Sequence, residues 1–179
     1  MPRLFTGLEI PADIAFALSL KRGGLHGARW IDAENYHITL RFIGDVDNAT
    51  AADVEASLER LANSLPFTVR LTHLGGFGGN KPHALYAGIE LNDTLARLQA
   101  AHERLLQRIG LAPEGRKYTP HVTLARLRGT APEEVARYLA MAGRFEPMEF
   151  PARRFVLYSS RDSVGGGPYV VEQSYPLAA

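Results

Sequence analysis

Two copies of a His-x-Thr pattern are the residues in this sequence best suited to do chemistry. The segment Tyr36-His37-Ile38-Thr39-Leu40 recurs as Pro120-His121-Val122-Thr123-Leu124. The histidine and threonine content of the chain predicts only about 0.3 His-x-Thr pairs by chance. Alternate side chains of a strand share a face. His37 and Thr39 should therefore point one way, and His121 and Thr123 should do the same in their own strand.

If the two strands meet across a pseudo-twofold axis, two histidines and two threonines converge on one cleft. Such a set suits a phosphodiester, because one neutral imidazole accepts a proton from water while a protonated partner donates one to the leaving oxygen. An ordinary histidine pKa of ~6.5 lets both forms coexist near neutral pH. Threonine hydroxyls donate to non-bridging oxygens, where negative charge builds. The alternative is a pair of structural histidines at a sheet surface, bonded to carbonyls.

The other histidines suggest no second site. His26, His73 and His83 lie near expected loops or strand ends and are predicted to be solvated. His102 shares a helix face with leucines and is predicted to belong to the core. A metal held by the two motif histidines would need at least a third ligand, and no motif supplies one. We therefore expect no metal site.

Composition bounds the class of protein. A chain of 179 residues is expected to form a single domain over residues 1–179. Cysteine is absent, which excludes disulfide scaffolds and thiolate chemistry. No apolar run approaches the ~18 residues needed to cross a bilayer. The start of the chain lacks a signal-peptide pattern, so a cytoplasmic location is predicted. A net charge of +1 argues against a protein that coats duplex nucleic acid.

Hydrophobic patterning places the motifs on strands. Strands are expected at 3–10, 36–43, 67–74, 84–91, 121–127, 154–159 and 169–175. Helices are expected after Pro11, after Asn48 or Thr50, over 93–109 and after Pro132. Several neighbouring strands are joined too tightly for parallel crossovers. The prediction is an α+β fold with antiparallel sheets and outer helices. The repeated motif predicts two related lobes, an internal duplication with a central cleft.

The motifs also carry a resemblance to a known family. Two segments resemble the paired signatures of the two-histidine phosphoesterase superfamily. They are His37 to Leu40 followed by Arg41-Phe42-Ile43-Gly44, and Pro120 to Leu124 followed by Ala125-Arg126. Within it, the chain is most similar to the bacterial and archaeal RNA 2′,3′-cyclic phosphodiesterases, first named 2′-5′ RNA ligases. The resemblance extends over nearly the whole chain, through Arg3-Leu4-Phe5, Arg29-Trp30 and Tyr175-Pro176-Leu177.

The resemblance implies a bilobal fold and opening of a 2′,3′-cyclic phosphate at an RNA 3′ end to a 2′-phosphomonoester, without metal or cofactor. It implies that His37 is the proton donor and His121 the proton acceptor. Thr39 and Thr123 would hold the phosphate.

Further substrate contacts are expected from Arg126 and from aromatic residues. Arg126 resembles a phosphate-binding arginine of the family, yet strict alternation turns it away from His121, so contact requires a bend in the strand. Arg41 has the same orientation in the first motif and is expected to be solvated. The aromatic candidates for stacking on a terminal base are Phe5, Trp30, Phe42, Phe77 and Tyr118. Phe77 is favoured because its glycine-rich loop offers little core.

The motifs also fit other functions. The same chemistry at phosphorus would serve 2′-5′-linked oligonucleotides or another small cyclic phosphate. A different class is a non-catalytic module that binds single-stranded RNA. Without ATP, 2′-5′ ligation is expected only as a weak reverse reaction. The expected partner is RNA with a 2′,3′-cyclic phosphate, and the chain is expected to act as a monomer, away from membranes.

Overall fold

The computed structural model describes residues 1–160 and 166–177 and contains nine strands and four α-helices in those ranges. The strands are β1 (Arg3–Glu9), β2 (Ala28–Trp30), β3 (His37–Asp45), β4 (Phe67–Phe77), β5 (Ala84–Ile89), β6 (His121–Leu127), β7 (Met148–Ala152), β8 (Arg154–Ser159) and β9 (Val170–Pro176). The helices are α1 (Ala12–Ser19), α2 (Asn48–Leu58), α3 (Asp93–Arg108) and α4 (Pro132–Ala142), with 3-10 turns at Ala33–Asn35 and Glu59–Leu61.

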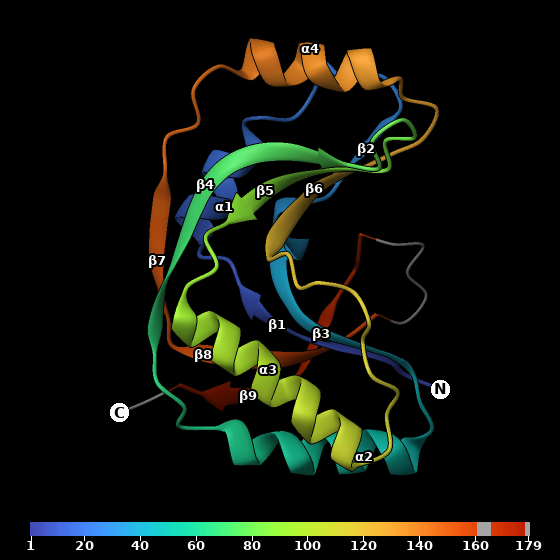
Figure 1. Ribbon diagram of the computed structural model, residues 1–179, viewed down its shortest axis with the longest axis vertical. Coiled ribbons are helices and arrows are strands. Elements are labelled where there is room, and N and C mark those ends of the chain that lie inside the picture. Colours follow the sequence, from blue (N-terminus) through green and yellow to red (C-terminus); the bar gives the residue numbers. More distant parts are fainter. Residues whose placement is uncertain (161–165, 178–179) are drawn as a thin grey trace.

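The strands form one antiparallel sheet in the order β7-β4-β5-β6-β3-β1-β8-β9, with β2 paired to β6. Helices α2 and α3 lie at one end of the molecule and α4 at the other (Figure 1). The predicted α+β class and antiparallel pairing are confirmed. The expected two sheets are halves of one sheet, because Ile38 of β3 pairs with Val122 of β6.

Most expected elements are present, and the differences have local causes. Strand β7 was not anticipated, because Pro151 interrupts its sequence; the strand pairs only with β4, at the sheet edge, where proline is tolerated. Asp47, rather than Asn48 or Thr50, caps α2, since its carboxylate accepts the Thr50 N–H at 2.7 Å.

Strand β4 runs further than expected, through Gly75 and Gly76 to Phe77. The expectation of a loop rested on the glycines, yet here a glycine permits close packing within the sheet. A Cβ on Gly75 would lie 2.6 Å from the ring of Tyr86, which crosses over it from β5. Phe77 is therefore placed by the sheet, not by a loop.

His102 is a core residue, as predicted. Its side chain is fully buried on α3, where Nδ1–H donates to the Leu98 carbonyl at 2.8 Å and the ring packs edge-on against Phe155. Nε2 has no hydrogen-bond partner among the described residues. Burial lowers the pKa of His102 to about 4, which the hydrogen bond to Leu98 only partly offsets.

This burial predicts acid sensitivity of the fold. The unfolded chain protonates His102 near pH 6.5, whereas the folded chain resists protonation until about pH 4. The stability that depends on neutral His102 is therefore present above pH 6.5 and is lost as the pH falls toward 4, by up to about 3 kcal/mol. Urea unfolding of His102→Gln should show a shallower pH dependence than wild type over this range. His26→Gln, at an exposed position, is the control, and equal slopes for wild type and His102→Gln would contradict the prediction.

Candidate active site

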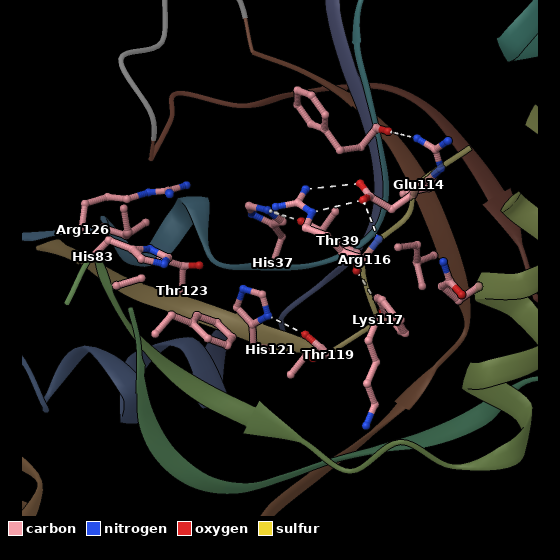
Figure 2. Close-up of a pocket in the computed structure, with 18 of the residues that line it drawn as sticks. His37, Thr39, His83, Glu114, Arg116, Lys117, Thr119, His121, Thr123 and Arg126 are labelled. Atoms are coloured by element: carbon pink, nitrogen blue, oxygen red, sulfur yellow. Dashed lines mark hydrogen bonds and ion pairs between the residues drawn. The ribbon is translucent and has the colours of Figure 1, made fainter. Parts of the chain in front are cut away.

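The two motif histidines face one cavity because their strands meet at the centre of the sheet. Ile38 and Val122 are paired and buried, so the residues on either side of them turn to the opposite face. Figure 2 shows His37 and Thr39 on one side of this cavity and His121 and Thr123 on the other. The convergence predicted for the four side chains is present.

The same hydrogen bond, from Nδ1 to the backbone carbonyl two residues earlier, fixes the tautomer of both imidazoles. Nδ1 of His37 lies 2.9 Å from the Asn35 carbonyl oxygen, and Nδ1 of His121 lies 2.7 Å from the Thr119 carbonyl oxygen. A carbonyl only accepts hydrogen bonds, so each Nδ1 carries the proton. In the neutral ring Nε2 is then a free base. Nε2 of His37 lies 3.1 Å from the Thr39 hydroxyl, which donates to it in this state.

A β-bulge follows each motif at the same position. In β3, Thr39 pairs with Gly7 and Arg41 with Thr6, which leaves Leu40 as an extra residue. In β6, Thr123 pairs with Tyr86 and Ala125 with Leu85, which leaves Leu124 as an extra residue. Each bulge advances the alternation of side chains by one residue. The residue three places after each threonine therefore returns to the face of the histidines.

The bulge in β6 brings Arg126 to the cavity, which strict alternation would have prevented. Arg126 lines the cavity with His121 and Thr123 and is exposed. The equivalent position in β3 is Phe42, whose side chain is 48% exposed and also lines the cavity. The bend that Arg126 requires is thus present in β6, and the separate bulge in β3 brings the ring of Phe42 to the same cavity.

Arg41 is buried, so the expectation of a solvated side chain is wrong. Its side chain is only 7% exposed and pairs with Glu103 on α3. The side chain extends toward α3, where it meets Glu103, and Arg41 also forms part of the cavity lining. Solvation was expected because strict alternation turns Arg41 away from the histidines and the resemblance gives it no role at the phosphate. Its partner Glu103 lies 62 residues away.

Aromatic rings surround both histidines. His37 contacts Phe5, Tyr158 and Tyr169, with ring centroids 4.9, 5.5 and 4.9 Å away. His121 contacts Phe77 and Tyr86 edge-on, at 4.8 and 5.6 Å. Phe77 in turn stacks on Tyr86 at 4.1 Å, which fixes its ring as a wall beside His121.

The crowded surroundings keep both imidazoles neutral. Burial lowers the pKa of His37 to about 4, against the opposing effect of its hydrogen bond to Asn35, and the positive charges of His121 and Arg126 lower it further. Burial also lowers the pKa of His121, with a contribution from Arg126. An anion bound between them would act in the opposite direction and favour the protonated forms.

The cavity has a volume of about 450 Å³ and is lined from both halves of the sheet. Tyr118 lines it and donates its hydroxyl to the Thr39 carbonyl at 2.9 Å. Arg126 lies at one end and Lys117 at the other (Figure 2). Among the described residues, no group of three or more His, Cys, Asp or Glu is placed to hold a metal. No helix in the described ranges is long and apolar enough to span a membrane.

One candidate from the sequence lies elsewhere. Within the part of the chain that the structure describes, Trp30 is not among the residues lining the cavity. It pairs with Ala125 through β2 and packs against Tyr138 of α4, at a centroid distance of 6.0 Å. Its proximity to the first motif in sequence suggested a site role, but β2 directs its ring to the helical side.

Sequence reasoning missed Tyr169 and Tyr86. Tyr169 contacts His37 from the far end of the chain, and Tyr86 contacts His121 from β5. Each contact depends on pairing between strands distant in sequence. The available signal was the composition of Ala84–Ile89, in which Tyr86 is the one side chain with a polar group among apolar residues.

Comparison with known proteins agrees with this geometry. The model of the 2′-5′ RNA ligase superfamily matches residues 19–163. The RNA 2′,3′-cyclic phosphodiesterase of Thermotoga maritima is 32% identical over 182 aligned positions, which cover 94% of this chain and 92% of that protein. The enzyme of the same name from Bacillus subtilis is 33% identical over 130 positions, covering 70% and 71%.

Solved structures share the fold. The structure of TT0787 from Thermus thermophilus matches with a TM-score of 0.81 and 25% identity, covering 98% of this chain and 97% of that one. The structure of E. coli LigT complexed with 3′-AMP matches with a TM-score of 0.78 and 23% identity over the full length of both chains. At that identity, the second match speaks for the fold alone.

The position of Arg126 predicts a measurable electrostatic effect on both histidines. Because its positive charge lowers both pKa values, Arg126→Met should raise the pKa of His37 and of His121. Titration of the side-chain nitrogens by NMR would report both values. Arg128→Met, an exposed position beyond the bulge, is the matched control and should leave both unchanged. A fall in either pKa on removing Arg126 would contradict the placement.

Proposed function

We propose that this chain, which belongs to the 2′-5′ RNA ligase superfamily, hydrolyses 2′,3′-cyclic phosphates at RNA 3′ ends to 2′-phosphomonoesters. The observation that carries the proposal is the pair of imidazoles across one cavity, each with Nδ1 bonded to a carbonyl two residues earlier. This leaves two Nε2 atoms for proton transfer, in a chain whose curated relatives carry the name of this activity.

In the proposed reaction, Nε2 of His121 takes a proton from water as the water oxygen bonds to phosphorus. The bond between phosphorus and the 3′ oxygen breaks, and protonated His37 delivers a proton from Nε2 to that oxygen. The free base at His121 Nε2 supports the acceptor role. Both histidines make the same hydrogen bond from Nδ1 to a backbone carbonyl, so this geometry does not distinguish the donor from the acceptor. The assignment of the two roles therefore follows the family.

The donor role requires a proton that free His37 holds only weakly, since its pKa is lowered to about 4. A bound phosphodiester supplies the missing counter-charge, because its negative charge favours the imidazolium and offsets the repulsion from Arg126. Thr39 would exchange its bond to Nε2 for a bond to a non-bridging oxygen, and Thr123 would donate from the other side. Arg126 would neutralise the same oxygens.

Three aromatic side chains offer contacts for the terminal nucleoside. Tyr118 and Phe77 line the cavity, and the exposed ring of Phe42 stands at a position equivalent to that of Arg126. Because every base has a π-face, stacking on such rings supports binding with little sequence preference. Phe77 packs against Tyr86 and His121, so its ring is fixed in place and favours a role as one side of the binding site for the base.

An internal duplication of one domain is our interpretation of the two halves. Each motif carries the same bond from Nδ1 and the same bulge after its threonine, which supports a common origin. One chain supplies both motifs, so a monomer suffices for the proposed reaction. The cytoplasmic location stays a prediction, as does weak reverse 2′-5′ ligation.

Phosphorus NMR of a short RNA with a 2′,3′-cyclic phosphate, incubated with the protein and excess EDTA, tests the proposal. Wild type should convert the cyclic signal to that of a 2′-phosphomonoester. His37→Ala and His121→Ala should each reduce turnover by about 10²–10⁴-fold while remaining folded, because each removes a proton-transfer group. His26→Ala, exposed and remote from the cavity, is the control. An unchanged cyclic signal with wild type would favour a 2′-5′ diester substrate or a non-catalytic RNA-binding module.

The lowered pKa values also predict the pH dependence. In the free enzyme His37 titrates near pH 4 and His121 below its ordinary value, so kcat/KM should peak below pH ~6.5 and fall on both sides. The bound anion raises the pKa of His37, so the alkaline limb of kcat should lie at higher pH than that of kcat/KM. Initial rates from pH 4 to 9 measure both profiles. A kcat/KM that rises steadily across this range would refute the two-histidine account.

A further inference from the structure

Arg41 connects three parts of the chain from a buried position beside the motif. Its Nε donates to Glu103 of α3, and one terminal nitrogen donates to the Phe42 carbonyl on its own strand. The other terminal nitrogen donates to the Ala112 carbonyl at 2.5 Å and lies 3.5 Å from Glu103. The planar fork of arginine makes these contacts at once, which the single ammonium of lysine cannot do.

Glu103 completes the connection. Its carboxylate is 18% exposed and accepts the backbone N–H of Glu114 at 2.9 Å and the side-chain amide of Gln107 at 2.7 Å, besides Arg41. Burial would raise the pKa of Glu103, but the hydrogen bonds from Arg41 and Glu114 outweigh it and hold the pKa below its ordinary value. The Glu103 carboxylate is therefore ionised at neutral pH.

The segment that this pair holds is the 111–120 loop, which joins α3 to β6. At its start, Ala112 and Glu114 are bonded to Arg41 and Glu103. At its end, the Tyr118 hydroxyl donates to the Thr39 carbonyl, and the Thr119 carbonyl receives the Nδ1–H of His121. The loop thus runs from the buried ion pair to the bond that orients His121.

We propose that Arg41 and Glu103 are positioning residues, which set the orientation of His121 toward His37 through the 111–120 loop. This inference rests on the proposed function, since the orientation of His121 matters for turnover only if that ring moves a proton. The direct backbone pairing of β3 with β6 is short, at Ile38 and Val122, so the loop supplies a second connection between the two histidines. Small displacements of a reacting group can cost about 10²-fold in rate.

The sharpest variant removes both charges together. Arg41→Met alone would leave a buried carboxylate without its partner and would destabilise the fold, whereas replacing both partners of a buried pair with apolar residues is often tolerated. The double variant Arg41→Met/Glu103→Met therefore removes the tethers of the loop while leaving no lone charge. The matched control is Arg70→Met/Glu90→Met, which removes the exposed ion pairs of Arg70 with Glu90 and with Glu149, outside the cavity.

Three measurements on each folded variant separate positioning from stability. They are kcat and KM on a nucleoside 2′,3′-cyclic phosphate, the melting temperature, and the side-chain nitrogen NMR signals of His121. We expect a fall in kcat of about 10–100-fold in the Arg41/Glu103 double variant, with a smaller change in KM. The signals of His121 should move from the Nδ1–H tautomer toward a mixture of both tautomers. Arg41→Lys keeps the charge but not the planar fork, so its kcat should also lie below that of wild type. The Arg70/Glu90 control should match wild type.

Two outcomes would overturn the inference. One is an unchanged kcat in the folded double variant, and the other is a lower kcat with the NMR signals of His121 unaltered. If the double variant does not fold, Glu103→Gln keeps an acceptor for Glu114 but weakens the hold on Arg41, and it should show a smaller change in the same two readouts. Inactive wild-type protein in the same assay would instead refute the proposed function, which distinguishes the two failures.

Discussion

The pairing of Ile38 with Val122 joins the two halves of the sheet, and the arrangement of the site depends on it. Both residues are fully buried, so the hydrophobic effect holds the two strands together on the side facing the core. The same pairing obliges the flanking histidines and threonines to face the opposite side. The paired apolar residues Ile38 and Val122 are thus as necessary to the site as the polar ones, although neither of them lines the cavity.

The bulges and the aromatic rings then determine the electrostatics of that face. Each bulge returns a third side chain to the cavity, arginine on one side and phenylalanine on the other. The rings of Phe5, Tyr158 and Tyr169 exclude water from His37, and those of Phe77 and Tyr86 do so from His121. Burial lowers the pKa of both imidazoles and so favours their neutral forms, whereas a bound anion would favour the protonated forms. The site thus suits a phosphodiester, whose negative charge stabilises the protonated histidine that the protein alone disfavours.

Much of this could be predicted from the sequence, and what could not has a common cause. Alternation and turn residues locate the strands, and the repeated motif identifies the four central side chains. The bulges leave no local signal, so the face of Arg126 stayed open until the pairing of β5 with β6 was known. The burial of Arg41 could not be foreseen, because its partner, Glu103, lies on a helix 62 residues further along the chain. Trp30 was misplaced for the same reason, since the pairing of β2 with β6 decides which side of the sheet its ring faces. Tyr169 was missed because it reaches His37 from a segment far along the chain.

In the proposed reaction, two Nε2 atoms, on rings oriented by the carbonyls of Asn35 and Thr119, act on opposite sides of one phosphorus. A crystal structure with a nucleoside 2′,3′-cyclic vanadate, which mimics the five-coordinate transition state, tests this most directly. The account predicts that Nε2 of His121 and Nε2 of His37 each lie about 2.6–3.2 Å from a different apical oxygen of the vanadate. Both histidines on the same oxygen, or either one bonded only to equatorial oxygens, would contradict it.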